Sequence, residues 1–234
     1  DNAIKYSDKI AIEDENNSLS WKELYESSDR IARFFLEMGY EKGCHIGLSG
    51  KNSVEWAKIF LGILKFGGIP ILLNIQLKIC ELKKMVEHCD IECIVYEEQI
   101  NTVKKLDNEK IKCICFDEIE YTSFNKADFK LEKLKILPSD TACIIFTSGS
   151  TSMPKAVMLS HKNILSNSSS IVKALHWNSD DKMCICVPMF HCFGLTAGLL
   201  SGIVSKACMY IIREFRNKKV FEAITSGNCN ILSG

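Results

Sequence analysis

The chain alternates short apolar runs with segments of helical periodicity, and this alternation is the strongest constraint on its fold. Apolar runs that predict strands occupy residues 9–12, 45–48, 69–73, 92–96, 113–117, 142–146, 156–159, 182–187 and 207–212. Helical spacing predicts helices at residues 20–38, 53–66, 81–88, 161–175, 195–204 and 218–226. Residues 118–139 are polar and aperiodic, which indicates a surface excursion. We therefore expect an α/β fold in which parallel-rich β-sheets are flanked by helices.

Two of the expected helices carry a start signal. Ser20 and Glu23 have the spacing of a capping box, in which each side chain accepts a hydrogen bond from the other residue's backbone N–H. Glu23 is therefore expected to cap a helix rather than to take part in chemistry. Ser53 is expected to cap the next helix, which has so little polar face that it should be buried. The apolar stripe expected on the first helix, with Ser28 its one weak member, is Trp21, Leu24, Tyr25, Ser28, Ile31, Ala32 and Phe35.

The segment with the clearest chemical content is residues 147–155, Thr-Ser-Gly-Ser-Thr-Ser-Met-Pro-Lys, which follows the apolar run at 142–146. Backbone N–H groups and hydroxyls with little side-chain bulk suit the binding of phosphate oxygens, and Lys155 adds a positive charge. The segment is not a Walker loop, because no Gly-Lys-Ser/Thr sequence closes it. A flexible surface linker is the alternative. We favour phosphate binding, because linkers rarely emerge from an apolar strand.

Residues 146–161 resemble the signature loop of the AMP-forming adenylating enzymes, which include acyl-CoA synthetases, adenylation domains of peptide synthetases and luciferases. Three further segments resemble motifs of that superfamily in the expected order: residues 19–24, residues 64–68 running on to 73–74, and residues 188–194. Four collinear motifs are a specific signal, and the match extends over essentially all 234 residues. The chain resembles the N-terminal portion of a fatty-acid or acyl-CoA synthetase.

The resemblance implies a ligase reaction in two steps. A carboxylate attacks the α-phosphorus of ATP, which gives an acyl-adenylate and pyrophosphate, and a thiol then takes the acyl group. The implied small molecules are ATP, a carboxylic acid of the fatty-acid type and CoA as acceptor, with Mg²⁺ held largely by residues outside this chain. The implied ATP-binding residues are Thr147, Ser148, Gly149, Ser150, Thr151 and Lys155.

The resemblance also assigns a catalytic position to His191, beside the substrate carboxylate and the adenylate. An imidazole there could hydrogen-bond a carboxylate oxygen or gate the tunnel to the site. A helix N-cap or a packed histidine is the structural alternative for this residue. Gly194 and Gly198 follow, and small residues at these positions are expected to leave room for an acyl group.

Two departures from the family pattern concern the loop. Ser152 and Ala156 stand where the family usually has glycine, and both should stiffen the loop or restrict its closure. The family's later motifs are missing, including the glutamate that helps hold magnesium and the catalytic lysine of the small C-terminal domain. We therefore expect residues 1–234 to be an incomplete N-terminal AMP-binding domain that is nearly inactive by itself.

Composition excludes several classes of protein. With 29 basic and 29 acidic residues, the chain lacks the basic field of a nucleic-acid binder. The most apolar region, residues 59–73, is interrupted by polar residues and glycines and is too short for a transmembrane segment. None of the twelve cysteines forms a Cys-x-x-Cys pair, so buried thiols in a reducing cytoplasm are expected rather than a zinc or redox site.

Two other functions stay open from the sequence. One is an adenylation domain that loads an amino or aryl acid onto a carrier protein. The other is a catalytically silent fragment or paralogue that binds a nucleotide or a partner, which the loss of two loop glycines favours and the intact residues 147–151 with Lys155 oppose. The sequence also leaves open the acyl chain length and whether the protein is a homo-oligomer.

Overall fold

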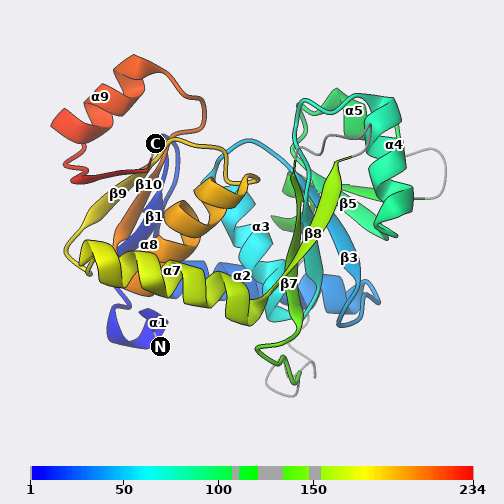
Figure 1. The fold of residues 1–234 in the computed structure, drawn as a ribbon, viewed down its shortest axis with the longest axis horizontal. Helices are drawn as coiled ribbons and strands as arrows, with labels where there is room; N and C mark the ends of the chain where they lie inside the picture. Colours follow the sequence, from blue (N-terminus) through cyan, green and yellow to red (C-terminus); the bar gives the residue numbers. More distant parts are fainter. Residues whose placement is uncertain (1, 107–110, 121–133, 148–153, 234) are drawn as a thin grey trace. The chain divides into compact units, whose positions relative to one another are not determined.

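The computed structural model describes residues 2–106, 111–120, 134–147 and 154–233. The chain divides into two compact units, each with its own sheet (Figure 1). Unit 1 comprises Asp1–Ser27, Lys51–Lys58 and Lys162–Gly234, and unit 2 comprises Ser28–Gly50 and Ile59–His161. Two long helices, α2 (Trp21–Glu37) and α3 (Val54–Lys65), begin in unit 1 and end in unit 2.

The sheet of unit 1 has the strand order β11-β9-β10-β1-β2. Its strands are β1 (Ile10–Glu13), β2 (Ser18–Ser20), β9 (Lys182–Ile185), β10 (Cys208–Ile211) and β11 (Ile231–Ser233). All neighbours pair in parallel except β1 and β2, so β1, β9, β10 and β11 end at one edge. The helices of this unit are α1 (Asn2–Lys5), α7 (His161–Leu175), α8 (Ser201–Ser205) and α9 (Asn217–Thr225).

The sheet of unit 2 has the strand order β6-β5-β3-β4-β7-β8. Its strands are β3 (His45–Ser49), β4 (Ile69–Leu72), β5 (Cys93–Tyr96), β6 (Lys112–Cys115), β7 (Thr141–Thr147) and β8 (Lys155–Ser160). All neighbours pair in parallel except β7 and β8, which form an antiparallel hairpin. The helices that lie wholly in this unit are α4 (Ile79–His88), α5 (Asn101–Lys104) and α6 (Phe116–Glu120).

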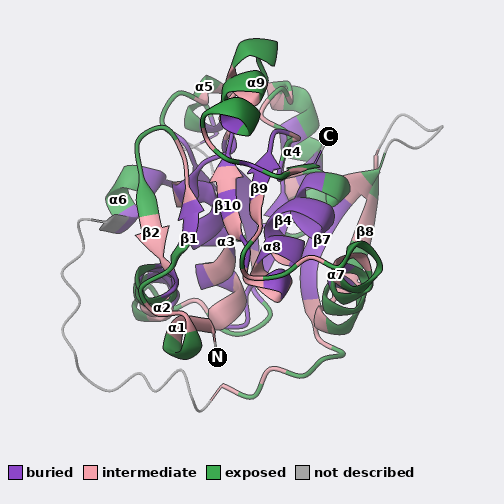
Figure 2. Cartoon of the chain, turned by 90° about the vertical axis from the view of Figure 1, so that its left-hand side faces the viewer, coloured by how far each residue is buried: buried purple, intermediate pink, exposed green. Residues whose placement is uncertain are grey.

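Strands in the interior of the two sheets are mostly buried, as Figure 2 shows for β4, β7 and β9, whereas the edge strands β2 and β8 contain no buried residue. Strands β4 and β5 are buried along their whole length, as expected for parallel strands covered on both faces. In unit 2 the ring of Phe35 on α2 stacks on Phe66 just after α3, with ring centroids 5.2 Å apart. The expected α/β architecture is thus confirmed, including the parallel character of both sheets.

The capping box at the start of α2 is formed as expected. The backbone N–H of Ser20 donates to Glu23 Oε2 at 2.8 Å, and the backbone N–H of Glu23 donates to Ser20 Oγ at 3.2 Å. The hydrogen bond from the Ser20 backbone, followed by one from the Ser20 hydroxyl to the same carboxylate, holds the pKa of Glu23 below its usual value. The expected apolar stripe differs at one position, because Tyr25 is exposed, whereas Ser28, its weak member, is buried as expected.

Several elements differ from the sequence prediction. Phe116 and Asp117 were expected to end a strand, but β6 stops at Cys115 and they begin α6, where the backbone N–H of Cys115 donates to Glu118 Oε1 at 3.0 Å. The helix expected at 195–204 is a π-helix, Gly194–Leu200, followed by α8. The elements α1, β2, α5, α6 and β11 were not expected, since each is too short to carry a periodic signal.

Candidate functional site

The loop predicted to bind phosphate lies in a β-hairpin at the edge of unit 2. Strand β7 ends at Thr147, β8 begins at Lys155, and these two residues are register partners on the neighbouring strands. Strand β7 also pairs in parallel with β4, through Ile144 and Ile71. The hairpin connection therefore lies at the carboxyl edge of the parallel strands, where ligands of open α/β sheets bind.

Thr147 and Lys155 are both exposed, so their hydroxyl and ammonium groups are available to a ligand. Four of the predicted phosphate-binding residues, Ser148, Gly149, Ser150 and Thr151, lie outside the described residues, as does Ser152. Ala156, the second replaced glycine, is half-buried on β8 opposite Phe146.

The far end of the hairpin is fixed by polar contacts around Asp140. The backbone N–H of Leu137 donates to Asp140 Oδ2 at 2.8 Å, and Lys42 Nζ lies 2.7 Å from the same oxygen. These contacts, the Leu137 hydrogen bond first, hold the pKa of the Asp140 carboxyl below its usual value. His161 follows β8 as the first residue of α7, and burial lowers its pKa. Its position at the helix start agrees with a structural role rather than with that of a base.

His191 lies in unit 1, in the turn between β9 and the π-helix. Its backbone N–H donates to Pro188 O at 3.1 Å, and its carbonyl accepts the N–H of Leu195 at 2.9 Å. Its side chain is exposed, which argues against the packed-histidine alternative. The ring is therefore free to meet a ligand at the carboxyl end of β9. The loop segment belongs to unit 2 and His191 to unit 1.

The glycines after His191 do not leave the room expected for an acyl group. A Cβ at Gly194 would lie 2.2 Å from Pro188 O, and a Cβ at Gly198 would lie 3.2 Å from Ile185 Cγ2. Gly194 is thus required by the close approach of the Pro188 backbone. Of the apolar residues nearby, Leu199 is fully buried whereas Phe193 is exposed.

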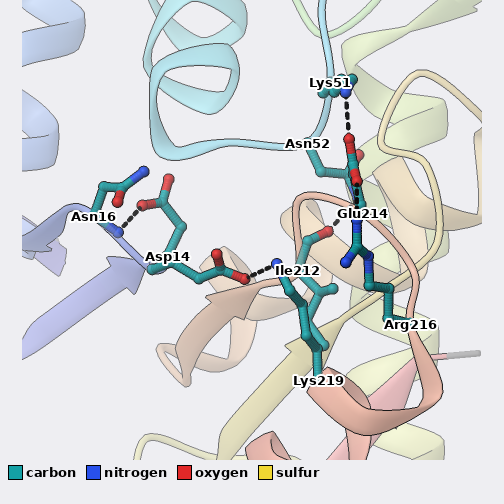
Figure 3. Close-up of polar contacts among 9 residues, drawn as sticks. Asp14, Asn16, Lys51, Asn52, Ile212, Glu214, Arg216 and Lys219 are labelled. Atoms are coloured by element: carbon teal, nitrogen blue, oxygen red, sulfur yellow. Dashed lines mark hydrogen bonds and ion pairs between the residues drawn. The ribbon is translucent and has the colours of Figure 1, made fainter.

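Two residues that sequence reasoning missed hold the surroundings of His191 together. The buried amide of Asn52 bonds to the backbone on both sides of Pro188 and, as Figure 3 shows, to the carbonyl of Ile212. Asp14 Oδ2 accepts the backbone N–H of Val54 at 3.0 Å. Their partners are backbone groups far away in the sequence, so no local pattern reveals them. The one available signal was the position of Asn52 directly before the predicted helix cap Ser53.

A separate cavity of about 610 Å³ lies in unit 1 between α9 and the ends of β1 and β10. Its lining includes the ion pair of Lys219 with Glu15, together with Tyr210 and Glu222. Burial raises the pKa of the Tyr210 hydroxyl. None of the residues predicted as functional lines this cavity.

Nine of the twelve cysteines are buried, whereas Cys80 and Cys192 are exposed. Burial raises the pKa values of Cys44 and Cys93 to about 12. Within the described residues, no group of three or more His, Cys, Asp or Glu side chains is arranged to hold a metal ion. Among those same residues, no helix has both the length and the hydropathy to cross a membrane.

A family model described as "AMP-binding enzyme" matches residues 1–234, the whole chain. The chain belongs to this family. The match agrees with the four collinear motifs and with the position of the hydroxyl-rich loop at the carboxyl edge of a parallel sheet.

Relatives of the chain include several CoA ligases. A putative acyl-CoA synthetase of Bacillus subtilis, YngI, is 25% identical over 262 residues, which cover 97% of this chain and 48% of the relative. The 2-succinylbenzoate–CoA ligase of Oceanobacillus iheyensis is 28% identical, covering 97% of this chain and 46% of the relative. The chain thus spans about half the length of the curated relatives it matches.

Solved structures match the fold of the chain. The o-succinylbenzoate CoA synthetase MenE of Bacillus subtilis, in complex with its acyl-adenylate intermediate, gives a TM-score of 0.90 at 21% identity, covering 99% of this chain and 59% of that one. ATP-bound MatB from Rhodopseudomonas palustris gives 0.80 at 22% identity, covering 96% and 46%. At these identities the likeness establishes the fold, which is that of the N-terminal part of acyl-CoA synthetase-like enzymes.

Proposed function

We propose that the protein to which this chain belongs activates a carboxylic acid with ATP and then transfers the acyl group to CoA. The observation that carries the proposal is the Thr147–Lys155 pair, which flanks a hydroxyl-rich loop at the carboxyl edge of the unit 2 sheet in a member of the AMP-binding enzyme family. Relatives named as acyl-CoA and CoA ligases support CoA as the acceptor.

The proposed role of the loop follows from where charge develops. Attack of a carboxylate on the α-phosphorus of ATP leaves negative charge on the departing pyrophosphate, so donors placed on its oxygens lower the barrier. Thr147 Oγ1 and Lys155 Nζ are exposed and suited to this task. We propose the loop residues Ser148, Gly149, Ser150 and Thr151 as further donors to the same phosphates.

His191 is the proposed contact to the substrate carboxylate. Its exposed imidazole follows the carboxyl end of β9, and a ring N–H there can donate to a carboxylate oxygen before the attack. A fatty acid is the proposed substrate, and a relative named as a medium-chain acyl-CoA ligase, from Rattus norvegicus, supports it at 26% identity.

We propose that residues 1–234 form the N-terminal AMP-binding part of a longer enzyme. The principal Mg²⁺ ligands and a small C-terminal domain are proposed to lie outside these residues. The share of the relatives that the chain covers, 48% and 46% for the two described above, supports this division. A cytoplasmic location is also proposed, and twelve cysteines, none of them in a disulfide within the described residues, support a reducing compartment.

The test is carboxylate-dependent exchange of pyrophosphate into ATP, measured on the full-length protein with fatty acids of several chain lengths. Lys155→Ala is expected to lower the exchange rate by about 10- to 100-fold, because a cation on the leaving pyrophosphate is lost. Lys84→Ala is the matched control, since Lys84 is an exposed lysine on α4 of the same unit and should leave the rate unchanged.

The outcomes separate the rival functions. Exchange without formation of an acyl-CoA would point to a carrier-protein acceptor instead of CoA. Nucleotide binding without exchange for any acid would identify a silent nucleotide-binding protein and would refute the proposal. The 234-residue chain alone is expected to exchange at a small fraction of the full-length rate, and robust turnover by it would refute the proposed division of the machinery.

A further inference from the structure

Asn52 is a buried polar residue of unit 1 that the reaction described above does not use. It lies just before α3, and the residue is only 7% exposed. Its side-chain amide makes three hydrogen bonds. Its Nδ2 donates to Val187 O at 2.8 Å and to Ile212 O at 3.4 Å, and its Oδ1 accepts the backbone N–H of Met189 at 2.8 Å. All three partners are backbone groups more than a hundred positions away in the sequence.

These partners lie just beyond the ends of neighbouring parallel strands. Val187 follows β9 and Ile212 follows β10, and the two strands pair directly in the sheet of unit 1. A backbone group past the end of a strand has left the ladder of hydrogen bonds and needs another partner when it is buried. The amide of Asn52 supplies both donor and acceptor at this place, which no aliphatic side chain of its size can do.

Asn52 is itself held firmly. Ser53 Oγ accepts the backbone N–H of Trp56 at 3.1 Å at the start of α3, and Asp14 accepts the backbone N–H of Val54 at 3.0 Å. On the other side, Lys51 forms an ion pair with Glu214, which follows β10 (Figure 3). The backbone position of Asn52 is therefore fixed, because Val54 is bonded to Asp14 just after β1 and Lys51 is paired with Glu214 after β10.

The segment that Asn52 anchors carries His191. The Met189 side chain is fully buried, and the turn after it is closed by the hydrogen bond from His191 N to Pro188 O. Gly194 packs against the same Pro188 carbonyl, so both ends of the turn are fixed to the body of unit 1. Asn52 fixes the base of this turn, and His191 is the residue that the turn presents to solvent.

We propose that Asn52 is a positioning residue that holds the 187–189 backbone so that the imidazole of His191 keeps one location at the substrate carboxylate. The inference rests on the proposed function of His191. Loss of the amide frees the Met189 N–H and two carbonyls, loosens the turn and spreads the imidazole over several positions. A misplacement of about 1 Å at a reacting centre is enough to slow a reaction by roughly a hundredfold.

The first test does not depend on activity. In the unmodified full-length protein, the Met189 amide should be protected from hydrogen exchange, as measured by mass spectrometry or NMR. Asn52→Ala should raise exchange in residues 187–193 by about tenfold or more, because the Met189 N–H loses its acceptor and opens locally. The isosteric Asn52→Asp keeps an acceptor for Met189 but loses the donor to the Val187 and Ile212 carbonyls, so it should also raise exchange in this segment. An unprotected Met189 amide, or variants with unchanged exchange in this segment, would overturn the anchoring role.

Ser53→Ala is the matched control. It removes a buried side-chain hydrogen bond from the adjacent residue, and loss of such a helix cap costs about 1 kcal/mol. It touches none of the backbone groups at 187–189, so it should lower stability without changing exchange in residues 187–193. An equal rise of exchange there in Ser53→Ala would show that Asn52 acts only through general stability.

The second test asks whether Asn52 acts through His191. Carboxylate-dependent exchange is measured for wild type, Asn52→Asp, His191→Ala and the double variant. Asn52→Asp is expected to lower kcat/KM for the carboxylate by about tenfold with the KM for ATP little changed, and to have less than about a twofold effect when His191 is already absent. If the losses of kcat/KM in the two single variants simply add in the double variant, the positioning role is refuted. If wild type shows no exchange, the proposed function fails, while the hydrogen-exchange comparison still decides the anchoring role.

Discussion

At the scale of single residues, close approach of backbones and side chains decides which positions tolerate change. Gly62 on α3 faces α2 within unit 2, and a Cβ there would lie 2.4 Å from Ile31 Cγ2 and 3.1 Å from the backbone oxygen of Ser28. A contact this short has to be relieved by a shift of one helix, because Ile31 is a buried β-branched residue with little rotamer freedom. Glycine at this position is thus a packing requirement.

We predict that Gly62→Ala lowers the free energy of unfolding by about 1–3 kcal/mol, as expected for an overpacked core. The sign of the change in stability is informative, because alanine stabilises a helix by roughly 1 kcal/mol relative to glycine when nothing clashes. Urea denaturation of the two proteins measures the difference. Gly198→Ala serves for comparison, because its nearest neighbour would be 3.2 Å away and its effect should be smaller. A stabilised Gly62→Ala variant would contradict the close approach of α2 and α3.

At the scale of elements, the start of α2 illustrates how local chemistry fixes a boundary. Ser20 and Glu23 exchange hydrogen bonds, and Ser20 Oγ donates a further one to Glu23 Oε2 at 2.8 Å. The two bonds that end on the Glu23 carboxylate, the one from the Ser20 backbone first, favour its ionised form, so its pKa is lower in the folded chain than in the unfolded one. A group with a depressed folded pKa stabilises the fold above its unfolded pKa, and this contribution disappears as the pH falls through the folded pKa.

We therefore predict a pH-dependent effect of Glu23→Gln. The variant should melt at a lower temperature than wild type above about pH 5, and the difference should shrink as the pH falls and vanish once wild-type Glu23 is protonated as well. Thermal denaturation across this pH range provides the measurement. Glu26→Gln, an exposed glutamate on the same helix, controls for the loss of one surface charge. A difference in melting temperature that does not change with pH would argue against the ionised capping box.

At the scale of the whole molecule, each of the two sheets has a buried core, and cysteines take part in both cores. Cys44, Cys93 and Cys113 are buried in unit 2, and Cys184 and Cys229 are buried in unit 1. Thiols act here as small apolar side chains, and burial keeps Cys44 and Cys93 protonated at neutral pH, with pKa values of about 12. Only a thiolate reacts readily with alkylating reagents.

We predict that a thiol reagent modifies Cys80 and Cys192 in the native protein well before any buried cysteine, because these two are exposed. Quantitative peptide mass spectrometry after brief treatment with N-ethylmaleimide gives the order of modification. A Cys80→Ser/Cys192→Ser variant should then label slowly until denaturant is added. Early labelling of Cys44 or Cys93 would mean that the core of unit 2 opens under native conditions.

Much of the fold could be predicted because it rests on local signals. The apolar run at 142–146 became β7, the periodic segment 161–175 became α7, and the serine cap before α3 was formed as expected. The short elements and the π-helix could not be predicted. A π-helix is distinguished from an α-helix by its i→i+5 hydrogen bonds, and no feature of residues 194–200 indicates that register.

The sequence by itself determined the family, the alternation of strands and helices, and the position of Thr147 directly after an apolar strand, because each of these depends on neighbouring residues. The tertiary structure alone decided that Thr147 faces Lys155 across a hairpin and that Asn52 binds the backbone before His191. The physical reason is that strand register and backbone hydrogen bonds join residues far apart in the chain, and such partners leave no local pattern to read.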